Sequence, residues 1–192
     1  MNFDVKSIIF IFTIKDGKIS LLVKNNDFIY NSCTGELDLL NFEFVKNNIG
    51  IKEFDLKQIH TFSKKNDNKI ELNILYIDII NINLIELRDG FDFIELDKLD
   101  KNNIYIKRSI EYLKQKLILN NTIKKLYPNE FSLPEIQIIY ENLLDKKIDR
   151  RNFRKKLIKQ DIIEPLGEMS IGKTGRPASL YKFKQTEEKS LI

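Results

Sequence analysis

Apolar and polar residues alternate in short blocks along the first hundred positions, a pattern typical of β-strands. Two β-rich runs, 5–14 and 18–23, flank Asp16-Gly17. An Asp-Gly pair between two apolar runs predicts a β-hairpin with a two-residue turn. The same criteria predict strands at 54–62, 69–81 and 91–96, with polar, turn-like segments at 25–35 and 64–68.

The run from Ile74 to Ile80 is too continuously apolar for a strand with one solvated face, and it indicates a central strand buried on both sides. Residues 37–48 predict a helix, which Gly50 is placed to end in a left-handed conformation. The apolar residues of this helix fall near helical spacing at Leu37, Leu40, Phe44 and Val45. These elements predict an α/β (α+β) sandwich, built from a mixed sheet with helices on its faces.

A strongly amphipathic pattern over residues 109–119 predicts a connecting helix. Its apolar stripe comprises Ile110, Leu113, Leu117 and Ile118. The helical pattern resumes at Thr122 and continues until Pro128. No Gly- or Ser-rich linker interrupts it, so we expect two docked domains, at 1–120 and 121–192. The helix either completes the first domain or also carries a dimer contact and relays the state of that domain.

The stretch from Phe131 to Phe183 predicts two short helices and a hairpin. Ser132 and Glu135 have the spacing of a capping box, and Pro134 fits the first turn of a helix. The buried stripe of this helix is expected at Ile136, Ile139, Tyr140 and Leu143, with a turn at 145–148. Asp149 is a plausible N-cap for the second helix, whose expected inward residues are Phe153, Leu157 and Ile158.

The second helix is strongly basic, and the hairpin, at 162–168 and 178–183, has a basic tip that contains glycine. This combination is the outline of a winged helix-turn-helix that binds DNA. A recognition helix presents its N-terminal residues to base edges, and basic wing residues suit phosphates or the minor groove. The predicted DNA-binding residues are Arg150, Arg151, Asn152, Arg154, Lys155 and Lys159 on the helix, and Lys173, Thr174 and Arg176 at the tip.

The charge distribution supports this assignment. The chain has 192 residues, a net charge of +4, and enough hydrophobic residues, 42%, for a packed core. Residues 121–192 contain 15 of the 32 Lys and Arg and 10 of the 28 Asp and Glu. The rest of the chain therefore contains 17 basic and 18 acidic residues. The positive excess therefore lies in the C-terminal part, where neutralisation of phosphates requires it.

Other residues point away from metal or redox chemistry. Cys33 is the one cysteine, which excludes an internal disulfide and a multi-cysteine zinc site. His60 lies in a predicted strand with no nucleophile or ligand spacing around it, so we expect a structural role. No apolar stretch approaches the roughly 20 residues that span a bilayer, and no secretory signal is visible, so we expect a soluble, cytoplasmic protein with no cofactor.

The order of elements, and the segment 37–52 followed by the strand KQIHTF, resemble a Nudix domain. The Nudix signature is G-x5-E-x7-R-E-U-x-E-E-x-G-U, where U is aliphatic. With Gly50-Ile51 on the final G-U, Asn47 and Asn48 fall on the paired glutamates, and Phe44 falls on the glutamate of the R-E pair. Nudix hydrolysis holds divalent cations on these carboxylates. We therefore expect no metal site and no catalytic residue.

The C-terminal part resembles the winged helix of the Nudix-related transcriptional regulators, the NrtR family. The resemblance is carried by FSLPEIQIIYENLL from Phe131, DRRNFRKKL from Asp149, EPLG from Glu164, GRPASLY from Gly175, and YLKQKL and LYP in the connector. It implies a catalytically inactive Nudix domain joined to a winged helix-turn-helix. It also implies a homodimer that represses genes of NAD or related metabolism, with an ADP-ribose-type ligand that alters DNA binding.

Two segments depart from the family pattern. A glycine-rich P-G-G-F-V segment and an R-D-P-R-like loop are usual, but here 31–36 is NSCTGE and 63–68 is SKKNDN. The effector could therefore be another nucleotide or a phosphosugar. Two other functions stay open: a diverged Nudix hydrolase of nucleoside diphosphate derivatives, or a module that binds protein or RNA. A basic helix can also be simply a solvated face.

Overall fold

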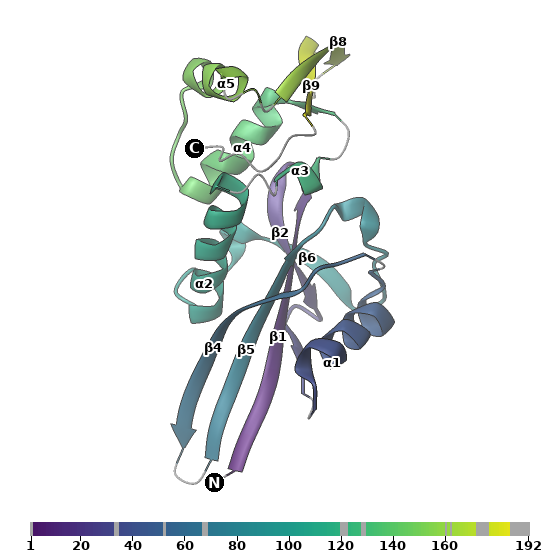
Figure 1. The fold of residues 1–192 in the computed structure, drawn as a ribbon, viewed down its shortest axis with the longest axis vertical. Coiled ribbons are helices and arrows are strands. Elements are labelled where there is room, and N and C mark those ends of the chain that lie inside the picture. Colours follow the sequence, from purple (N-terminus) through teal and green to yellow (C-terminus); the bar gives the residue numbers. More distant parts are fainter. Residues whose placement is uncertain are drawn as a thin grey trace. The chain divides into compact units, whose positions relative to one another are not determined.

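The computed structural model describes residues 2–32, 35–51, 53–66, 69–119, 123–127, 130–159, 161, 163–171 and 177–184 (Figure 1). The chain divides into two compact units. The first comprises Met1–Thr13 and Ser20–Ser109, and the second comprises Ile14–Ile19 and Ile110–Ile192. One continuous helical segment, 104–119, runs across this division, and the boundary at 120 stays a prediction.

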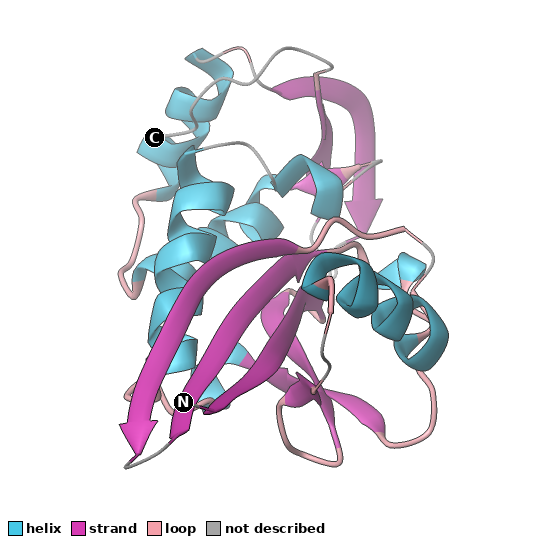
Figure 2. Cartoon of the chain, turned by 60° about the horizontal axis from the view of Figure 1, so that its bottom comes forward, coloured by secondary structure: helices cyan, strands magenta, loops and turns pink. Residues whose placement is uncertain are grey.

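The first unit is built on a six-stranded mixed sheet, shown in magenta in Figure 2. Its order is β4-β5-β1-β2-β6, with β3 paired to β1. Strands β1 and β5 run parallel, whereas β4 and β5, β2 and β6, and β1 and β3 are antiparallel. The strands are β1 (Asn2–Lys15), β2 (Lys18–Lys24), β3 (Ile29–Asn31), β4 (Lys57–Asn66), β5 (Lys69–Ile79) and β6 (Phe91–Glu95).

The predicted hairpin and central strand are both confirmed. Asp16 and Gly17 have φ of 51° and 76°, the positive pair that a tight two-residue turn requires. Strand β5 lies between β1 and β4, and every residue from Ile74 to Ile80 is buried. The prediction missed β3, which lies inside the segment expected to be a turn. It also misplaced β4, which begins at Lys57 and continues through Asn66, because polar residues extend a strand whose backbone is paired to β5.

Helix α1 (Leu37–Phe44) covers one face of this sheet and continues into a π-helical turn, η1 (Val45–Ile49). Gly50 ends it with φ of 84°, as predicted. Val45 and Ile49 are buried against Ile9, Ile11 and Leu22 of the sheet. Short 3₁₀ turns η2 (Ile82–Leu84) and η3 (Leu96–Lys98) flank β6.

Helix α2 (Ile104–Leu113) begins against the opposite sheet face. The Tyr105 ring meets that of Phe62 on β4 at a centroid distance of 4.9 Å. Phe62 pairs with Asn73 of β5, whereas the next residue of β5, Ile74, pairs with Ser7, which faces α1. Because successive strand residues point to opposite faces, Phe62 and the ring of Tyr105 lie on the face opposite α1. The connecting helix continues from α2 as a π-helical segment, η4 (Lys114–Leu119), which the sequence pattern did not predict.

The second unit has the predicted helix-turn-helix followed by a hairpin. Its elements after η4 are α3 (Ile123–Leu126), β7 (Phe131–Ser132), α4 (Leu133–Leu144), α5 (Arg150–Lys159), β8 (Ile163–Ile171) and β9 (Pro177–Phe183). The strands form a sheet in the order β7-β9-β8. The capping box is present, because the Ser132 N–H donates to the Glu135 carboxylate at 2.7 Å. The predicted stripe Ile136, Ile139, Tyr140 and Leu143 is buried.

Tyr140 joins three elements of this unit. Its hydroxyl donates to the Leu117 carbonyl of η4 at 3.1 Å, and its ring lies 5.4 Å from that of Phe153 on α5. The connecting helix is therefore packed directly on the helix-turn-helix. Among the described helices, none is long and apolar enough to cross a membrane.

Candidate nucleic-acid interface

Helix α5 begins at a side-chain cap. The Asn152 N–H donates to the Asp149 carboxylate at 2.8 Å, and the Phe153 N–H donates to the Asp149 carbonyl at 2.9 Å. An N-cap carboxylate satisfies an otherwise unpaired helical N–H and stabilises the positive end of the helix dipole. This contact confirms the predicted N-cap and fixes where the first turn of α5 begins.

The inward face of α5 is narrow. Phe153 and Leu157, one helical turn apart, are buried at 8% and 2% exposure. The prediction that Ile158 also faces inward is wrong, because its side chain is 50% exposed. Successive helical residues are turned by about 100°, so Ile158 points away from the side that Leu157 buries. A two-residue anchor leaves most of the helix circumference to solvent.

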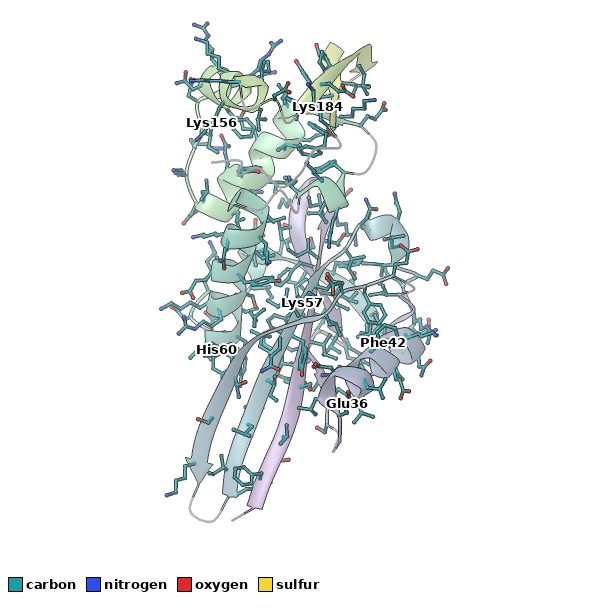
Figure 3. All side chains as sticks on the ribbon, viewed as in Figure 1. Glu36, Phe42, Lys57, His60, Lys156 and Lys184 are labelled. Atoms are coloured by element: carbon teal, nitrogen blue, oxygen red, sulfur yellow. The ribbon has the colours of Figure 1, made fainter. Side chains whose placement is uncertain are left out.

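That outer surface is strongly basic. All the predicted helix residues, Arg150, Arg151, Asn152, Arg154, Lys155 and Lys159, are exposed, and so is Lys156. Figure 3 shows side chains projecting from the α5 ribbon, with Lys156 labelled. Within Arg150–Lys159 there is no acidic residue. We define the six cations of α5, which are Arg150, Arg151, Arg154, Lys155, Lys156 and Lys159, as the basic face.

The basic face differs from the cations of the hairpin. Lys182 pairs with Glu164 at 2.9 Å, and Lys184 pairs with Asp161 at 2.6 Å. In the described part of the chain, by contrast, no cation of the basic face is held in an ion pair. Guanidinium and ammonium groups in this state can pair with phosphates or base edges without first breaking a protein contact.

The hairpin provides the frame of the wing. Strands β8 and β9 pair from Ile163–Phe183 to Ile171–Pro177, with an irregularity between Pro165 and Met169. The paired ends at Ile171 and Pro177 bring the two sides of the predicted tip together. The tip residues Lys173, Thr174 and Arg176 lie outside the described residues.

At the Nudix-like position, side chains donate hydrogen bonds to backbone carbonyls at the end of α1. Asn47 and Asn48 are exposed, and the Asn48 amide donates to the Phe44 carbonyl at 3.0 Å. The Arg88 guanidinium donates to the Asn47 carbonyl. Gly50 is tightly enclosed there, since a Cβ would lie 2.9 Å from the Glu86 carbonyl oxygen. Neutral amides are much poorer ligands for a hard cation than the carboxylates of the Nudix signature, and a guanidinium is not a ligand for such a cation.

A protein-family model matches part of the second unit. Residues 123–183 match the NrtR DNA-binding winged helix domain. The match covers α3, β7, the two helices of the helix-turn-helix and both wing strands. The C-terminal region is an NrtR-type winged helix. The resemblance drawn from the sequence motifs is thereby confirmed.

A curated relative is the ADPR responsive transcriptional repressor NtrR of Acinetobacter baylyi. It is 27% identical to this chain over 148 residues, which is 70% of this chain and 58% of the relative. The matched region thus spans little more than half the length of that repressor.

Solved structures share the fold. Shewanella oneidensis NrtR gives a TM-score of 0.69 at 19% identity over 96% of this chain and 97% of that one. Its complex with a 27mer DNA gives 0.66 at 18% identity, over 94% and 93%. A MutT/nudix family protein from Enterococcus faecalis gives 0.64 at 13% identity, over 96% and 87%. The predicted combination of a Nudix-like sheet and a winged helix is therefore correct.

The sequence did not reveal the polar network under α1 in the unit that precedes the NrtR-type winged helix. Asn41 is fully buried, donates to the Ser7 hydroxyl at 2.9 Å and accepts from the Asn31 amide at 2.9 Å. Nearby, the Tyr76 hydroxyl donates to Asp38 at 2.9 Å. Polar residues at helical spacing gave no signal that they face inward. His60 is half-buried with its ring 4.5 Å from Phe62, and Cys33 lies outside the described residues.

Proposed function

We propose that this protein is a sequence-specific DNA-binding transcriptional regulator, a repressor that acts as a homodimer. The observation that carries the proposal is the basic face of α5, capped at Asp149 and anchored by Phe153 and Leu157. A helix of this kind fits the major groove with its N-terminal residues toward the bases. The family match of residues 123–183 to a DNA-binding domain supports the same conclusion.

Individual residues have distinct roles in this proposal. Arg150, Arg151 and Asn152 occupy the first turn, where arginine can bind guanine bidentately and asparagine can bind adenine. Arg154 and Lys155 follow on the same exposed surface and also face the major groove, and Lys159 extends the contact along the helix. Lys173, Thr174 and Arg176 of the wing extend the contact to phosphates or to the minor groove.

The first unit acts as a sensor without catalysis. Asn47, Asn48 and Phe44 occupy the positions where Nudix hydrolases carry carboxylates, so the metals that polarise a diphosphate would have no anionic ligands there. The relative from Acinetobacter baylyi is an ADPR responsive repressor, and ADP-ribose or a related nucleotide or phosphosugar is the effector class we propose. The regulated genes would serve NAD or related metabolism.

Selection and titration test the DNA-binding role. The full-length protein should enrich a defined duplex from a random library. Arg151→Glu with Arg154→Glu should weaken binding to that duplex at least about 100-fold, since each bidentate base contact contributes on the order of 1–3 kcal/mol. Lys46→Glu with Lys101→Glu is the matched control, because both lysines are exposed, lie in the first unit and change the net charge equally.

The control pair should stay within about threefold of the wild type, and the logarithm of the binding constant should fall with log[salt] by about 0.9 per phosphate contacted. Equal losses in the two double variants would show that overall charge, rather than α5, determines binding. A slope near zero would favour a protein or RNA partner over duplex DNA.

A separate experiment tests the sensor. Incubation with ADP-ribose and Mg²⁺ should release no product beyond the uncatalysed background, and addition of ADP-ribose should change operator affinity by about 5- to 150-fold. Turnover at about 1 s⁻¹ or faster would make the first unit an enzyme. An unchanged operator affinity would remove ADP-ribose as the effector and leave DNA binding intact.

A further inference from the structure

The turn between α4 and α5 is held by side chains of α4. Helix α4 ends at Leu144, and its C-cap, Asp145, has a left-handed φ of 54°, a conformation that glycine adopts most often. The Lys146 N–H donates to the Glu141 carbonyl at 3.3 Å. Three residues later the chain starts α5 at its N-cap, Asp149. The direction in which α5 leaves α4 is therefore decided within residues 145–148.

Two side chains bind both backbone polar groups of Ile148. Its N–H donates to the Glu141 carboxylate at 2.9 Å, and its carbonyl accepts from the Gln137 amide at 3.0 Å. The Gln137 amide also donates to the same carboxylate at 2.9 Å. Gln137 and Glu141 are one helical turn apart on α4, which places them side by side. We call this pair the turn clamp.

The turn clamp is a charged, largely enclosed contact. The Glu141 side chain is 11% exposed, whereas that of Lys147, which donates to it at 3.1 Å, is 94% exposed. The bond from Gln137, followed by the Ile148 N–H and Lys147, lowers the pKa of Glu141 to about 2. The carboxylate is thus ionised at neutral pH, and hydrogen bonds to an ionised acceptor are stronger than neutral ones.

We propose that Gln137 and Glu141 are positioning residues for DNA recognition, which set the angle at which α5 presents its first turn to the base edges. This inference rests on the proposed function. Ile148 directly precedes the N-cap of α5, so fixing both of its backbone groups fixes the start of the recognition helix. Neither residue needs to contact DNA.

The proposal has a specific thermodynamic signature. Phosphate contacts from flexible cations tolerate a small reorientation of α5, and they provide the non-specific part of binding. Bidentate base contacts depend on geometry and provide specificity. A loosened turn should therefore weaken binding to the selected operator and leave binding to an unrelated duplex unchanged. A loss of folded protein would reduce both affinities by the same factor.

The test uses the full chain with the selected operator and a scrambled duplex of equal length. Glu141→Ala and Gln137→Ala should each weaken operator binding at least about tenfold, with scrambled-duplex binding within about twofold of the wild type. The loss of operator-binding free energy in the double variant should be smaller than the sum of the losses in the two single variants, because both side chains act on Ile148. Glu141→Gln, which keeps an oxygen for the Ile148 N–H, should recover part of the loss.

Lys147→Ala is the matched control, since it removes only the exposed ion pair of Glu141, and both affinities should stay within about twofold. Titrations well below each variant's melting temperature separate orientation from unfolding. Operator affinity that survives Glu141→Ala and Gln137→Ala, or an equal fall for both duplexes, overturns the role of the turn clamp. A wild-type protein that prefers no duplex at all overturns the proposed function itself.

Discussion

Helices α1 and α5 are similar in length, eight and ten residues, yet they place polar groups on opposite sides. Helix α1 buries the Asn41 amide and ends in a π-helical turn, where the Asn48 side chain donates to the Phe44 carbonyl. Helix α5 buries only Phe153 and Leu157 and turns six cations outward. Polar groups that face inward stabilise one structure, whereas charges that face solvent are available to a partner. Of these two helices, α5 has the exposed cations that suit a polyanion.

The largest change in stability is expected at Phe153, which anchors α5 with its buried ring. Phe153→Ala should reduce the free energy of unfolding by about 3–5 kcal/mol, because it removes a buried ring that packs against Tyr140 and leaves a cavity. Ile158→Ala, on the exposed side, should stay within about 0.5 kcal/mol. Urea unfolding measures both variants, and similar losses would mean that α5 is anchored on a wider face than the structure shows.

The corresponding residue in α1 is Asn41, whose amide is buried. Asn41→Ala should reduce the free energy of unfolding by about 1–3 kcal/mol, because the Asn31 amide and the Ser7 hydroxyl lose their shared partner. Glu43→Ala, on the exposed side of the same helix, serves as the control and should be nearly neutral. If chemical denaturation finds Asn41→Ala as stable as wild type, the polar network does not stabilise α1.

The N-termini of helices α5 and α1 should differ in how much stability is lost when their N-cap residues are replaced. Asp149→Ala should destabilise the second unit by about 1 kcal/mol, since the carboxylate accepts the Asn152 N–H at 2.8 Å. Glu36→Ala at the start of α1 should have almost no effect, because its side chain makes no capping hydrogen bond. Thermal melts of the two variants provide the comparison, and the reverse order would contradict it.

A smaller effect should appear as a pH dependence. The pKa of Glu141 is lowered to about 2 in the folded protein, below the value of about 4.3 for an unfolded chain. Ionised Glu141 therefore contributes its full stabilisation above about pH 5 and loses it as the pH falls toward 2. The stability difference between wild type and Glu141→Gln should shrink from pH 6 to pH 3 in parallel melts. A constant difference would show that the charge of Glu141 does not stabilise the turn.

Much of the fold was predictable because local chemistry and tertiary packing agree. Asp16-Gly17 defined a turn, Ile74–Ile80 defined a central strand, and the spacing of Ser132 and Glu135 defined the start of α4. The basic residues of α5 were predictable for the same reason. Asp149, Phe153 and Leu157 fix the helix and its inner side, and the cations occupy what is left.

What the sequence did not predict depends on contacts between distant residues. Strand β3 is only three residues long and exists because Ile29 and Tyr30 pair with β1. The burial of Asn41 depends on Ser7 and Asn31, far from it in the chain. The turn clamp depends on how the backbone of Ile148 meets two polar side chains that, from the sequence alone, would be placed in solvent.

Hydrogen exchange with and without the selected operator tests the central claim most directly, because it compares α5 with α1 in one experiment. The account predicts slower exchange of amides in 150–159 when the duplex is bound, with the amides of 37–44 unchanged. A complex that forms without protecting α5, or that protects α1 instead, would contradict the account.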